Sequence, residues 1–315
     1  ASEANIELLK EKLNWEPEYK LENSIPIIID YERKQKKYRE KIIKNPKVLI
    51  TSAGSKSFWI SEMKKALDKY KNNCEVICGD IDENCTGRYL ADDFWKMPET
   101  NNQNLEIIIS KLIELNINIV LPSRDGELIF WSSNKEKLKK LGIHVIVSPL
   151  ESVEKCLDKL KFYNFGLKKG FNFITTSSDI NNISAKRYVV KEQYGAGSNS
   201  LGINLEKEEA LAYGKNLKNP IFQPFIKGQE ISIDAWLDDS HILKGLILRT
   251  RDKVVEGESK ITTTFFNKKL EEEATKVLES LKLSGPIVLQ CILTEDDDIF
   301  FMECNTRFGG GSTAS

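Results

Sequence analysis

Three polar residues alternate along one apolar segment near the end of the sequence. Glu303, Asn305 and Arg307 occupy every second position of FFMECNTRFGGG. Alternate residues of a strand project from one face, so the pattern predicts a polar face, with Met302 and Cys304 turned the other way into apolar surroundings. Carboxylate and amide oxygens suit Mg²⁺, and an arginine beside them could meet remaining anionic charge. A solvated sheet face with a surface ion pair is the alternative.

The preceding apolar strand offers a further amide oxygen to this polar face. Gln290 ends an apolar run in GPIVLQCIL, and the acidic turn TEDDD separates that run from DIFFMECN. Two strands joined by such a turn are expected to pair as a hairpin, which would place Gln290 beside Glu303. Gln290, Glu303 and Asn305 are therefore the expected oxygen ligands of a magnesium site.

A glycine-rich turn next to a lysine indicates a second kind of chemistry, the binding of phosphate. The segment YVVKEQYGAGSNSLGI places Lys191 at the end of an apolar strand, and Gly195 and Gly197 in the turn that follows. Glycines let backbone N–H groups approach phosphate oxygens, and the lysine supplies a positive charge. No G-K-[ST] follows, so the turn is not a Walker loop. An ordinary hairpin is the alternative.

Charge and composition argue against several other kinds of protein. The 46 Lys+Arg and 47 Asp+Glu residues give a formal net charge of -1, and the lysine runs are interleaved with glutamate. The sequence therefore has no basic stripe of the kind that binds nucleic acid. No apolar run approaches the roughly 20 residues that span a bilayer, and the first residues lack the pattern of a signal peptide. We therefore expect a cytoplasmic protein without a nucleic-acid or membrane partner.

Cysteine and histidine give little support to metal or nucleophile chemistry. The six cysteines have no C-x-x-C spacing, and the only histidines are His144 and His241. Zinc sites and disulfide frameworks are therefore not expected, and a Ser-His or Cys-His nucleophile has few candidates. Cys291 and Cys304 lie in apolar runs and are expected to be small buried side chains.

Strands and helices alternate from residue 47 onward. Strands are expected at VLITSAG, CEVICGD, INIVLPS and IHVIVSP, and helices at SFWISEMKKALDKY, LEIIISKLIELN and GELIFWSSNKEKLKKLG. Alternation of this kind predicts βαβ units and a parallel sheet over residues 47–148. Ser148 and Glu151 then have the spacing of a capping box at the start of the next helix.

Strands dominate the rest of the sequence. KRYVVKEQYGAGSNSLGI predicts strand, turn and strand, while NPIFQPFIKGQEISIDAWL and HILKGLILRT each predict a long strand. The segment LEEEATKVLESLKL predicts a helix with one apolar face. That face contains Leu270, Ala274, Val277, Leu278 and Leu281. Residues 149–315 therefore predict an α+β domain with a mostly antiparallel sheet and helices on one side.

Taken together, these motifs resemble the ATP-grasp superfamily, and most closely the branch of the carbamoyl-phosphate synthetase large subunit and related carboxylate–amine ligases. The resemblance runs from about residue 47 to 315 through VLITSAG, PSRDGEL, LDK, YVVKEQYGAGSNSLGI, FQPFIKGQEISID, and Gln290 with ECNTR. It implies α/β plus α+β architecture: a Rossmann-like parallel-sheet domain, 47–148, and a two-lobed ATP-grasp domain, 149–315. It also implies ATP and two Mg²⁺ ions, with Mn²⁺ as a substitute.

The resemblance implies a role for each matching residue. Phosphate contacts are implied for Lys159, Lys191 and the loop Gly195, Ala196, Gly197 and Ser198, which continues to Ser200. Adenine and ribose contacts are implied for Gln223, Pro224, Phe225, Ile226 and Glu230. The ions would bind to Gln290, Glu303 and Asn305, and Arg307 would stabilise the transferred phosphoryl group. Without the family, Lys159 is more simply a solvated lysine on a helix.

Two charged segments are similar to family elements near the acceptor substrate. In LRTRDKVVEGESK, which also contains Arg249 and Glu256, we expect Arg251 or Lys260 to approach the carboxylate substrate or its acyl phosphate. A mobile charged loop is the alternative. In PSRDGEL, Asp125 and Glu127 follow a strand, where α/β sheets bind ligands. A helix cap by Asp125 is the alternative.

Residues 1–46 form an expected appendage with a resemblance of its own. LNWEPEYKLENSIPIIIDYERK resembles the C-terminal tail of nucleotide-sugar epimerases and dehydratases. The glycine-rich start and the Tyr-x-x-x-Lys motif of such enzymes are missing from the sequence, so we expect no epimerase activity. A nucleotide-sugar enzyme is a further alternative, and the appendage is the one feature that suggests it.

The expected reaction is ATP-dependent ligation of a small carboxylate to a small amine through an acyl phosphate, with ADP and phosphate released. Family members often dimerise, so the resemblance allows a homodimer but leaves the oligomeric state open. The alternative is an ATP-binding protein with little or no catalysis. This alternative is favoured because the sequence stops at Ser315, directly after GGGSTA, whereas family members usually continue with elements that close the site.

Overall fold

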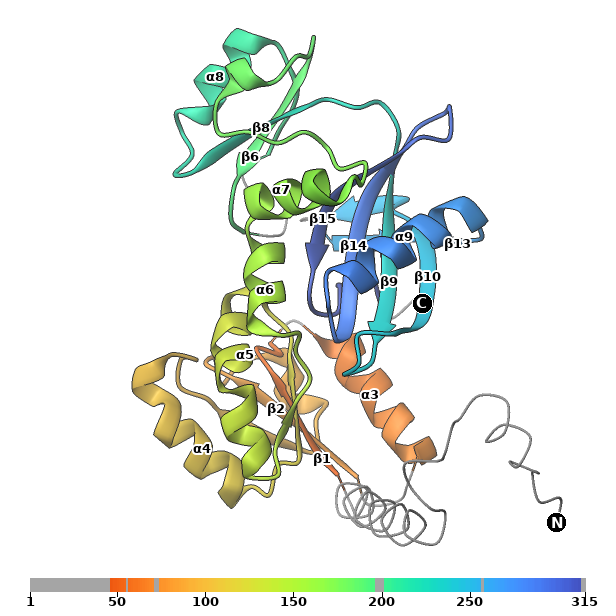
Figure 1. Cartoon of the computed structure of the whole chain (residues 1–315). Coiled ribbons are helices and arrows are strands. Elements are labelled where there is room, and N and C mark those ends of the chain that lie inside the picture. Colours follow the sequence, from red (N-terminus) through yellow and green to blue (C-terminus); the bar gives the residue numbers. More distant parts are fainter. Residues whose placement is uncertain (1–45, 55, 71–73, 196–200, 256–257, 313–315) are drawn as a thin grey trace, which may run out of the picture. The chain divides into compact units, whose positions relative to one another are not determined.

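The computed structural model describes residues 46–54, 56–70, 74–195, 201–255 and 258–312, and the chain from Pro46 onward forms one compact unit. Figure 1 shows its elements, whose labels begin with α3 and β1. Apart from Pro46, the expected appendage lies outside the described residues. Its likeness to an epimerase tail therefore stays a prediction.

A five-stranded parallel sheet forms the first part of the described chain. Its order is β3-β2-β1-β4-β5, and every neighbouring pair is parallel. The strands are β1 (Lys47–Thr51), β2 (Glu75–Asp80), β3 (Asp93–Lys96), β4 (Ile119–Pro122) and β5 (His144–Val145). The expected parallel sheet is confirmed. The sequence pattern did not predict β3, and IHVIVSP forms a strand over two residues only.

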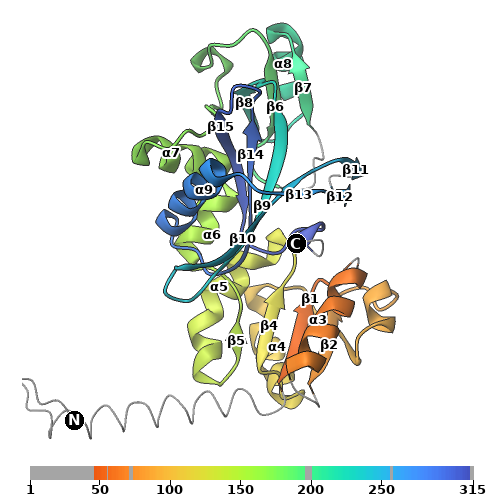
Figure 2. The same ribbon diagram turned by 90° about the vertical axis from the view of Figure 1, so that its right-hand side faces the viewer.

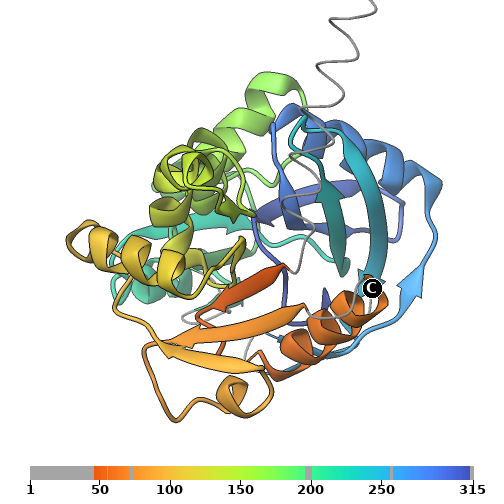
Figure 3. The same ribbon diagram turned by 90° about the horizontal axis from the view of Figure 1, so that it is seen from below.

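Helices cover both faces of this sheet because its strands are apolar on both sides. The helices are α3 (Ser57–Tyr70), α4 (Leu105–Glu114) and α5 (Asp125–Lys140), with the short 3₁₀ turns η1 (Thr86–Tyr89) and η2 (Asn102–Asn104). Val48 packs with Ile60 of α3, whereas Leu49 packs with Ile108 of α4 and Leu128 of α5. Figure 3 shows α3 on one side of the strands and α4 with α5 on the other.

The start of α5 is fixed by a buried carboxylate. Glu127 accepts hydrogen bonds from the backbone N–H groups of Ser123 and Arg124, at 3.0 and 3.1 Å, and from the indole N–H of Trp131 at 3.0 Å. Burial raises the pKa of Glu127 although these donors oppose the shift. The residue preceding the helix is Arg124, so the cap by Asp125 is not formed. Glu127 instead holds the turn that follows β4.

Two helices, α6 (Leu150–Leu157) and α7 (Lys159–Lys169), lead into the second part. The expected capping box of Ser148 and Glu151 is wrong, because Pro149 precedes α6 and no side chain caps it. Ser148 is buried, and its hydroxyl donates to the Ser284 carbonyl at 2.8 Å and accepts from the Ser284 N–H at 3.0 Å. A tertiary partner therefore replaces the local one.

Antiparallel sheets make up the rest of the chain. A three-stranded sheet has the order β7-β6-β8, from β6 (Tyr188–Glu192), β7 (Gly202–Leu205) and β8 (Pro220–Pro224), and carries η3 (Ile180–Asn182) and α8 (Lys207–Gly214). A five-stranded sheet has the order β13-β10-β9-β14-β15. Its strands are β9 (Gln229–Leu237), β10 (Leu243–Thr250), β13 (Thr264–Phe265), β14 (Gly285–Leu293) and β15 (Ile299–Asn305). The expected antiparallel α+β architecture is confirmed (Figure 2).

The expected helix LEEEATKVLESLKL forms as α9 (Lys268–Ser280) and packs on the five-stranded sheet. Its buried side chains are Leu270, Ala274, Val277 and Leu278, and Leu281 directly after it is buried too. The apolar face was therefore predicted correctly. The remaining strands, β11 (Lys253–Val255) and β12 (Glu258–Ile261), pair with each other.

The segment NPIFQPFIKGQEISIDAWL is two strands in different sheets, so the prediction of one long strand is wrong. β8 ends at Pro224, and β9 starts at Gln229. Between them, Gly228 lies so close to the neighbouring strand that a Cβ would stand 2.6 Å from the Leu293 carbonyl oxygen. The glycine lets the chain change sheets at this point.

Candidate active site

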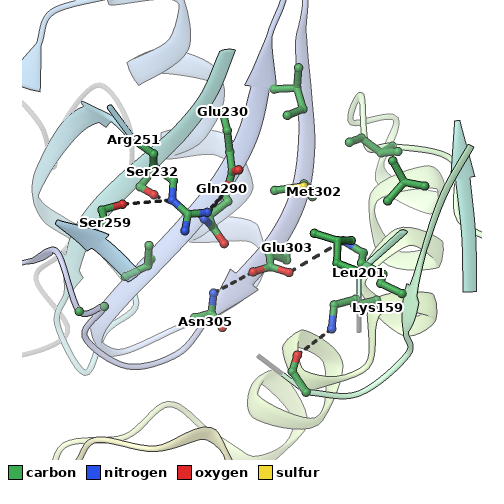
Figure 4. Close-up of a pocket in the computed structure, with 18 of the residues that line it drawn as sticks. Lys159, Leu201, Glu230, Ser232, Arg251, Ser259, Gln290, Met302, Glu303 and Asn305 are labelled. Carbon is green, nitrogen blue, oxygen red and sulfur yellow. Dashed lines mark hydrogen bonds and ion pairs between the residues drawn. The ribbon is translucent and has the colours of Figure 1, made fainter. Parts of the chain in front are cut away.

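A cavity of ≈ 850 Å³ lies among the two antiparallel sheets and the loops that follow β1 and β4. This volume falls within the range of small-molecule sites. The polar residues that line it come from strands of the antiparallel sheets and from the first residues of α5 and α7, and Figure 4 shows several of them. Most of the candidate residues that the structure describes therefore share one cavity.

The strand pair β14 and β15 carries the expected oxygen ligands. Gln290 stands opposite Glu303, as the hairpin prediction required. The register then shifts, because Cys291 pairs with Phe301 and Met302 is the extra residue of a β-bulge. Met302 consequently lines the cavity with Glu303, so the expectation that it faces the other way is wrong. Cys304 does face the apolar core, as expected.

Glu303 is surrounded by cationic and amide groups. Lys191 Nζ lies 3.9 Å from its Oε2 atom, and Asn305 Nδ2 donates to its Oε1 atom at 3.4 Å. Burial opposes the charged form of Glu303, but Lys191, Lys159 and the Asn305 hydrogen bond outweigh it and lower its pKa. Glu303 is therefore held as a carboxylate, which is the form that binds a metal ion.

Lys191 is almost enclosed at the end of β6, with 9 % of its surface exposed. Burial lowers its pKa, and Lys159 adds to this shift, whereas Glu303 opposes it. An anion in the cavity would favour the charged form and oppose this shift. The position suits a lysine whose partner is a phosphate group.

Lys159 is the first residue of α7 and is buried, so it is not a solvated lysine. Its Nζ atom donates to the Gly195 carbonyl at 2.8 Å. Asp158 holds this helix start by accepting from the backbone N–H groups of Leu160 and Lys161 and from the side chains of Gln193 and Tyr194. The same carboxylate thus ties α7 to the start of the glycine-rich turn.

The segment between β8 and β9 forms one wall of the cavity. Gln223, Pro224, Phe225 and Ile226 all line it. Gln223 is 2 % exposed, and its Nε2 atom donates to the Thr176 hydroxyl at 2.8 Å. Apolar residues also line the cavity: Ile174, Val189, Leu201, Ile203, Ile292 and Met302. A flat aromatic ring would find apolar contacts here beside backbone groups.

Glu230 and Arg251 form a second charged group across the five-stranded sheet (Figure 4). Arg251 Nη1 donates to Glu230 Oε1, and Gln290 Nε2 donates to the same oxygen at 2.9 Å. Arg251 Nε also donates to the Ser259 hydroxyl at 3.1 Å. Both charged residues line the cavity, as expected for site residues.

Arg307 pairs with Asp125 at the end of the cavity near β4. Its Nε and Nη2 atoms donate to the two oxygens of Asp125, at 2.8 and 2.5 Å, and its Nη1 atom donates to the Phe308 carbonyl at 2.9 Å. The two residues stand 182 positions apart in the sequence. Both line the cavity, as expected for Arg307 and Asp125, whereas Glu127, named with Asp125 in the same expectation, is fully buried and is not among the lining residues.

Arg249 lines the cavity but was not chosen as a site residue from the sequence. It pairs with Asp234 through Nε and is 3 % exposed. Its Nη1 atom has no hydrogen-bond partner among the described residues. A Cβ at Gly311 would stand 2.8 Å from this atom, so only a glycine leaves the guanidinium its space. A buried donor without a partner is costly unless a ligand completes it.

Some expected site residues do not reach the cavity or are not described. Lys260 lies exposed on β12 and is not among the described residues that line the cavity. Ala196, Gly197, Ser198 and Glu256 lie outside the described residues. Ser52, Lys56, Ser123 and Arg124 line the cavity and were missed. They follow β1 and β4, and the rule that ligands bind beyond the carboxyl ends of parallel strands could have found them.

The oxygen donors on β14 and β15 fit a magnesium ion. In the described part of the chain, no three His, Cys, Asp or Glu side chains cluster as metal ligands. Glu303 is a carboxylate with amide oxygens of Gln290 and Asn305 beside it, and Mg²⁺ accepts few protein ligands when phosphate and water supply the others.

Comparison of the sequence with protein families gives two adjacent matches. Residues 48–146 match the PylC-like N-terminal domain, and residues 156–311 match the ATP-grasp domain. The chain therefore contains an ATP-grasp domain, as its motifs indicated. A PylC-like N-terminal domain precedes it. A search among curated proteins found no match.

Several solved structures share the fold at low sequence identity. The biotin carboxylase domain of Hydrogenobacter thermophilus 2-oxoglutarate carboxylase has a TM-score of 0.63 and 15% identity, over 83% of this chain and 64% of that chain. L-amino acid ligase from Bacillus licheniformis has a TM-score of 0.64 and 17% identity, over 86% of this chain and 69% of that chain. N5-carboxyaminoimidazole synthetase from Staphylococcus aureus, complexed with ADP, has a TM-score of 0.62 and 14% identity, over 85% of this chain and 71% of that chain. The chain thus spans 64% of the length of the first of these.

Proposed function

We propose that this protein is an ATP-dependent carboxylate–amine ligase that acts through an acyl phosphate. The observation that carries the proposal is the convergence of Lys159, Lys191, Glu303 and Asn305 on a cavity that apolar side chains also line. The match to the ATP-grasp domain supports the same activity. Among the similar structures are a ligase of amino acids and a synthetase in complex with ADP.

The nucleotide would occupy the cavity between the two antiparallel sheets. Its adenine would lie against Gln223–Ile226 and the apolar side chains nearby, and Glu230 would accept hydrogen bonds from the ribose hydroxyls. Lys159 and Lys191 would bind the phosphates, with Gly195 and the turn after it covering them. Two buried lysines beside one carboxylate leave a positive excess, which supports a polyanionic ligand at this position.

Gln290, Glu303 and Asn305 would hold magnesium, and we propose two ions, with Mn²⁺ as a substitute. Bound there, the ions would neutralise phosphate charge during phosphoryl transfer. Glu303 supplies a carboxylate kept ionised by Lys191 and Lys159. The amide side chains add neutral oxygen ligands, so the site does not need a cluster of carboxylates.

The carboxylate substrate would bind near Arg249, Arg251 and Arg307. One of its oxygens attacks the γ-phosphorus of ATP, the bond to the β,γ-bridging oxygen breaks, and ADP leaves. The amine then attacks the acyl carbon and displaces phosphate. The unpartnered Nη1 atom of Arg249 supports an anion subsite at this end of the cavity. Lys260 would take part only if β12 moved towards the cavity, which makes Arg251 the better candidate.

The substrates are small molecules in this proposal, and the protein is a cytoplasmic homodimer. No helix in the described ranges has the length and apolar character needed to cross a membrane. Light scattering of the purified protein would measure the mass and test the dimer.

The proposal is tested by the release of ADP from ATP and Mg²⁺ in the presence of pooled amino acids and sugar acids. The wild type and Glu303→Ala are compared. We expect release that a substrate pool stimulates and that the substitution abolishes. Tight ATP binding without turnover in any pool would favour the non-catalytic alternative, and failure to bind ATP would contradict both functions.

A further inference from the structure

Arg307 and Asp125 satisfy each other in the described structure. Their side chains are 14% and 16% exposed, and the two hydrogen bonds between them form a bidentate pair. Arg307 follows β15, which carries Glu303 and Asn305, whereas Asp125 is the first residue of α5. The pair therefore joins the strand of the expected metal ligands to the parallel-sheet part of the chain.

In the proposed reaction, Arg307 binds the transferred phosphoryl group. The two donors that Asp125 holds, on Nε and Nη2, become available to that group only when part of the guanidinium turns away from Asp125. A partly buried carboxylate that loses its cation is destabilised, because neither water nor another charge compensates it fully. The phosphoryl group would therefore compete with Asp125 for Arg307 unless a second cation takes the place of Arg307.

Asp125 is also distinguished from the other carboxylates that line the cavity. Glu303 faces Lys191, and Glu230 pairs with Arg251 and accepts from Gln290. Glu192 accepts from the backbone N–H groups of Lys218 and Asn219 at 2.7 and 2.9 Å. Among the described lining carboxylates, Asp125 is thus the one whose two oxygens both accept from the arginine assigned to the transferred phosphoryl group.

The loops that follow β1 and β4 bring two serines as well as the cations Lys56 and Arg124 to the end of the cavity that holds this carboxylate. Ser52 and Ser123 line the cavity at the same end, and the Ser123 hydroxyl donates to the Ser52 carbonyl at 2.9 Å. Hydroxyl and carboxylate oxygens accept hydrogen bonds from an ammonium group, which has only donors to offer.

We propose that Asp125 binds the protonated amino group of the amine substrate, and that this ammonium replaces Arg307 while Arg307 turns to the phosphoryl group. The inference rests on the proposed function and names the subsite for its second substrate, a primary amine. The nitrogen attacks only as the free amine, so the ammonium complex is the docked state that precedes the attack.

The exchange of partners couples the two ligands. An anion at Arg307 exposes a carboxylate that a cation can bind, and a cation at Asp125 frees the guanidinium for an anion. Each ligand therefore raises the affinity for the other by the same factor. Without an amine, Asp125 holds Arg307 away from the phosphoryl group, which lowers wasteful hydrolysis of ATP.

The competing explanation is a purely structural pair that tethers α5 to the end of β15. A structural pair predicts that Asp125→Asn lowers thermal stability and weakens ATP and ADP equally. The exchange predicts a difference between the two nucleotides, because only ATP has the γ-phosphate that Arg307 would bind.

The test is calorimetric binding of Mg²⁺ with ADP and of Mg²⁺ with the β,γ-imido analogue of ATP. Methylammonium chloride is the amine probe, and sodium chloride and tetramethylammonium chloride at equal ionic strength are the reference salts. For the wild type, we expect methylammonium to raise the affinity for the analogue about 5-fold or more and to leave the affinity for ADP unchanged. For Asp125→Asn, we expect a larger preference for the analogue over ADP and no response to methylammonium.

Asp92→Asn is the matched control, because Asp92 pairs with Lys64 on the same sheet domain and does not line the cavity. It should behave like the wild type. Equal losses for both nucleotides in Asp125→Asn, with no methylammonium effect in the wild type, would overturn the exchange. Absence of nucleotide binding in all three proteins would overturn the proposed function itself, and this inference with it.

Discussion

Lys191 of β6 and Glu303 of β15 face each other across the cavity, with Nζ and Oε2 3.9 Å apart. The two residues belong to different sheets, so this contact links the three-stranded sheet to the five-stranded one. Burial lowers the pKa of Lys191, and the charges around Glu303 lower the pKa of that carboxyl group. The cavity is thus arranged for a ligand that carries both phosphate and metal.

Replacement of Glu303 by Gln should abolish turnover while keeping the fold. The substitution retains the shape but removes the charge that would bind magnesium. We expect the rate of Mg²⁺-dependent ADP release to fall by about 100-fold or more. Glu75→Gln, which alters an ion pair with Lys47 in the parallel sheet, serves as control and should keep the wild-type rate. Equal rates for Glu303→Gln and the control would rule out the metal role.

ATP affinity should fall on the alkaline side at a pH below the ordinary lysine value of 10.5. Burial lowers the pKa of free Lys191, whereas bound phosphate favours its charged form, so ATP binding at alkaline pH takes up a proton. Calorimetry in buffers of different ionisation heat measures this uptake. Lys191→Arg keeps its charge and should remove the effect. Proton release on binding would contradict the assignment.

The same shift predicts how Lys191 affects stability. Its folded pKa lies below the unfolded value, so the unfolded chain holds more protons between these two values. The burial cost of Lys191 is therefore present at lower pH and is relieved as the pH rises from the folded pKa towards 10.5. The free energy of unfolding of Lys191→Met, measured with denaturant, should not show this rise with pH. An identical pH dependence in the wild type and Lys191→Met would refute this effect of Lys191.

Asp158→Ala should weaken both the fold and the binding of nucleotide. Loss of the cap of α7 costs about 0.5–2 kcal/mol, and Lys159 directly after it loses its fixed position. Asn267→Ala is the matched control, because Asn267 caps α9 by accepting from Leu270 N–H at 3.0 Å and does not line the cavity. Both substitutions should lower the denaturation midpoint, but only Asp158→Ala should lower the affinity for ADP. An unchanged ADP affinity in both variants would show that Asp158 has no part in positioning the nucleotide site.

Gly166→Ala should destabilise the protein without a specific effect on nucleotide. A Cβ at this position of α7 would lie 2.3 Å from the Phe173 ring, so the ring has to move, at a cost of about 1–3 kcal/mol. Gly245→Ala is the control, since a Cβ there meets no atom within 4 Å. Thermal unfolding compares the two variants. Similar melting temperatures would show that the Phe173 ring yields easily.

Local patterns predicted much of this fold, and long-range contacts account for the errors. The apolar faces of α9 and the hairpin that pairs Gln290 with Glu303 follow from periodicity and a short turn. The bulge at Met302 depends on packing between neighbouring strands, which the sequence does not display. Ser148 binds Ser284 instead of capping a helix, because a buried partner far along the chain competes with the local one.

The site was predictable where motifs carry it, and not where two distant segments meet. Lys159, Lys191, Gln290, Glu303 and Arg307 came from motifs, and the structure brings all five to one cavity. The ion pair of Arg307 with Asp125 has no local signature, because it depends on how α5 packs near the end of β15. The role of Arg249 was hidden for the same reason, since only the structure shows its unpartnered Nη1 atom.

The acyl phosphate is the central claim, and hydroxylamine tests it most directly. This nucleophile attacks acyl phosphates and gives hydroxamates, so it can stand in for the unknown amine. The protein is incubated with ATP, Mg²⁺, hydroxylamine and pooled carboxylic acids, and ADP and hydroxamate are measured together. We predict equal amounts of the two products, and neither with Glu303→Gln. ADP formed in every pool without any hydroxamate would contradict the acyl-phosphate mechanism.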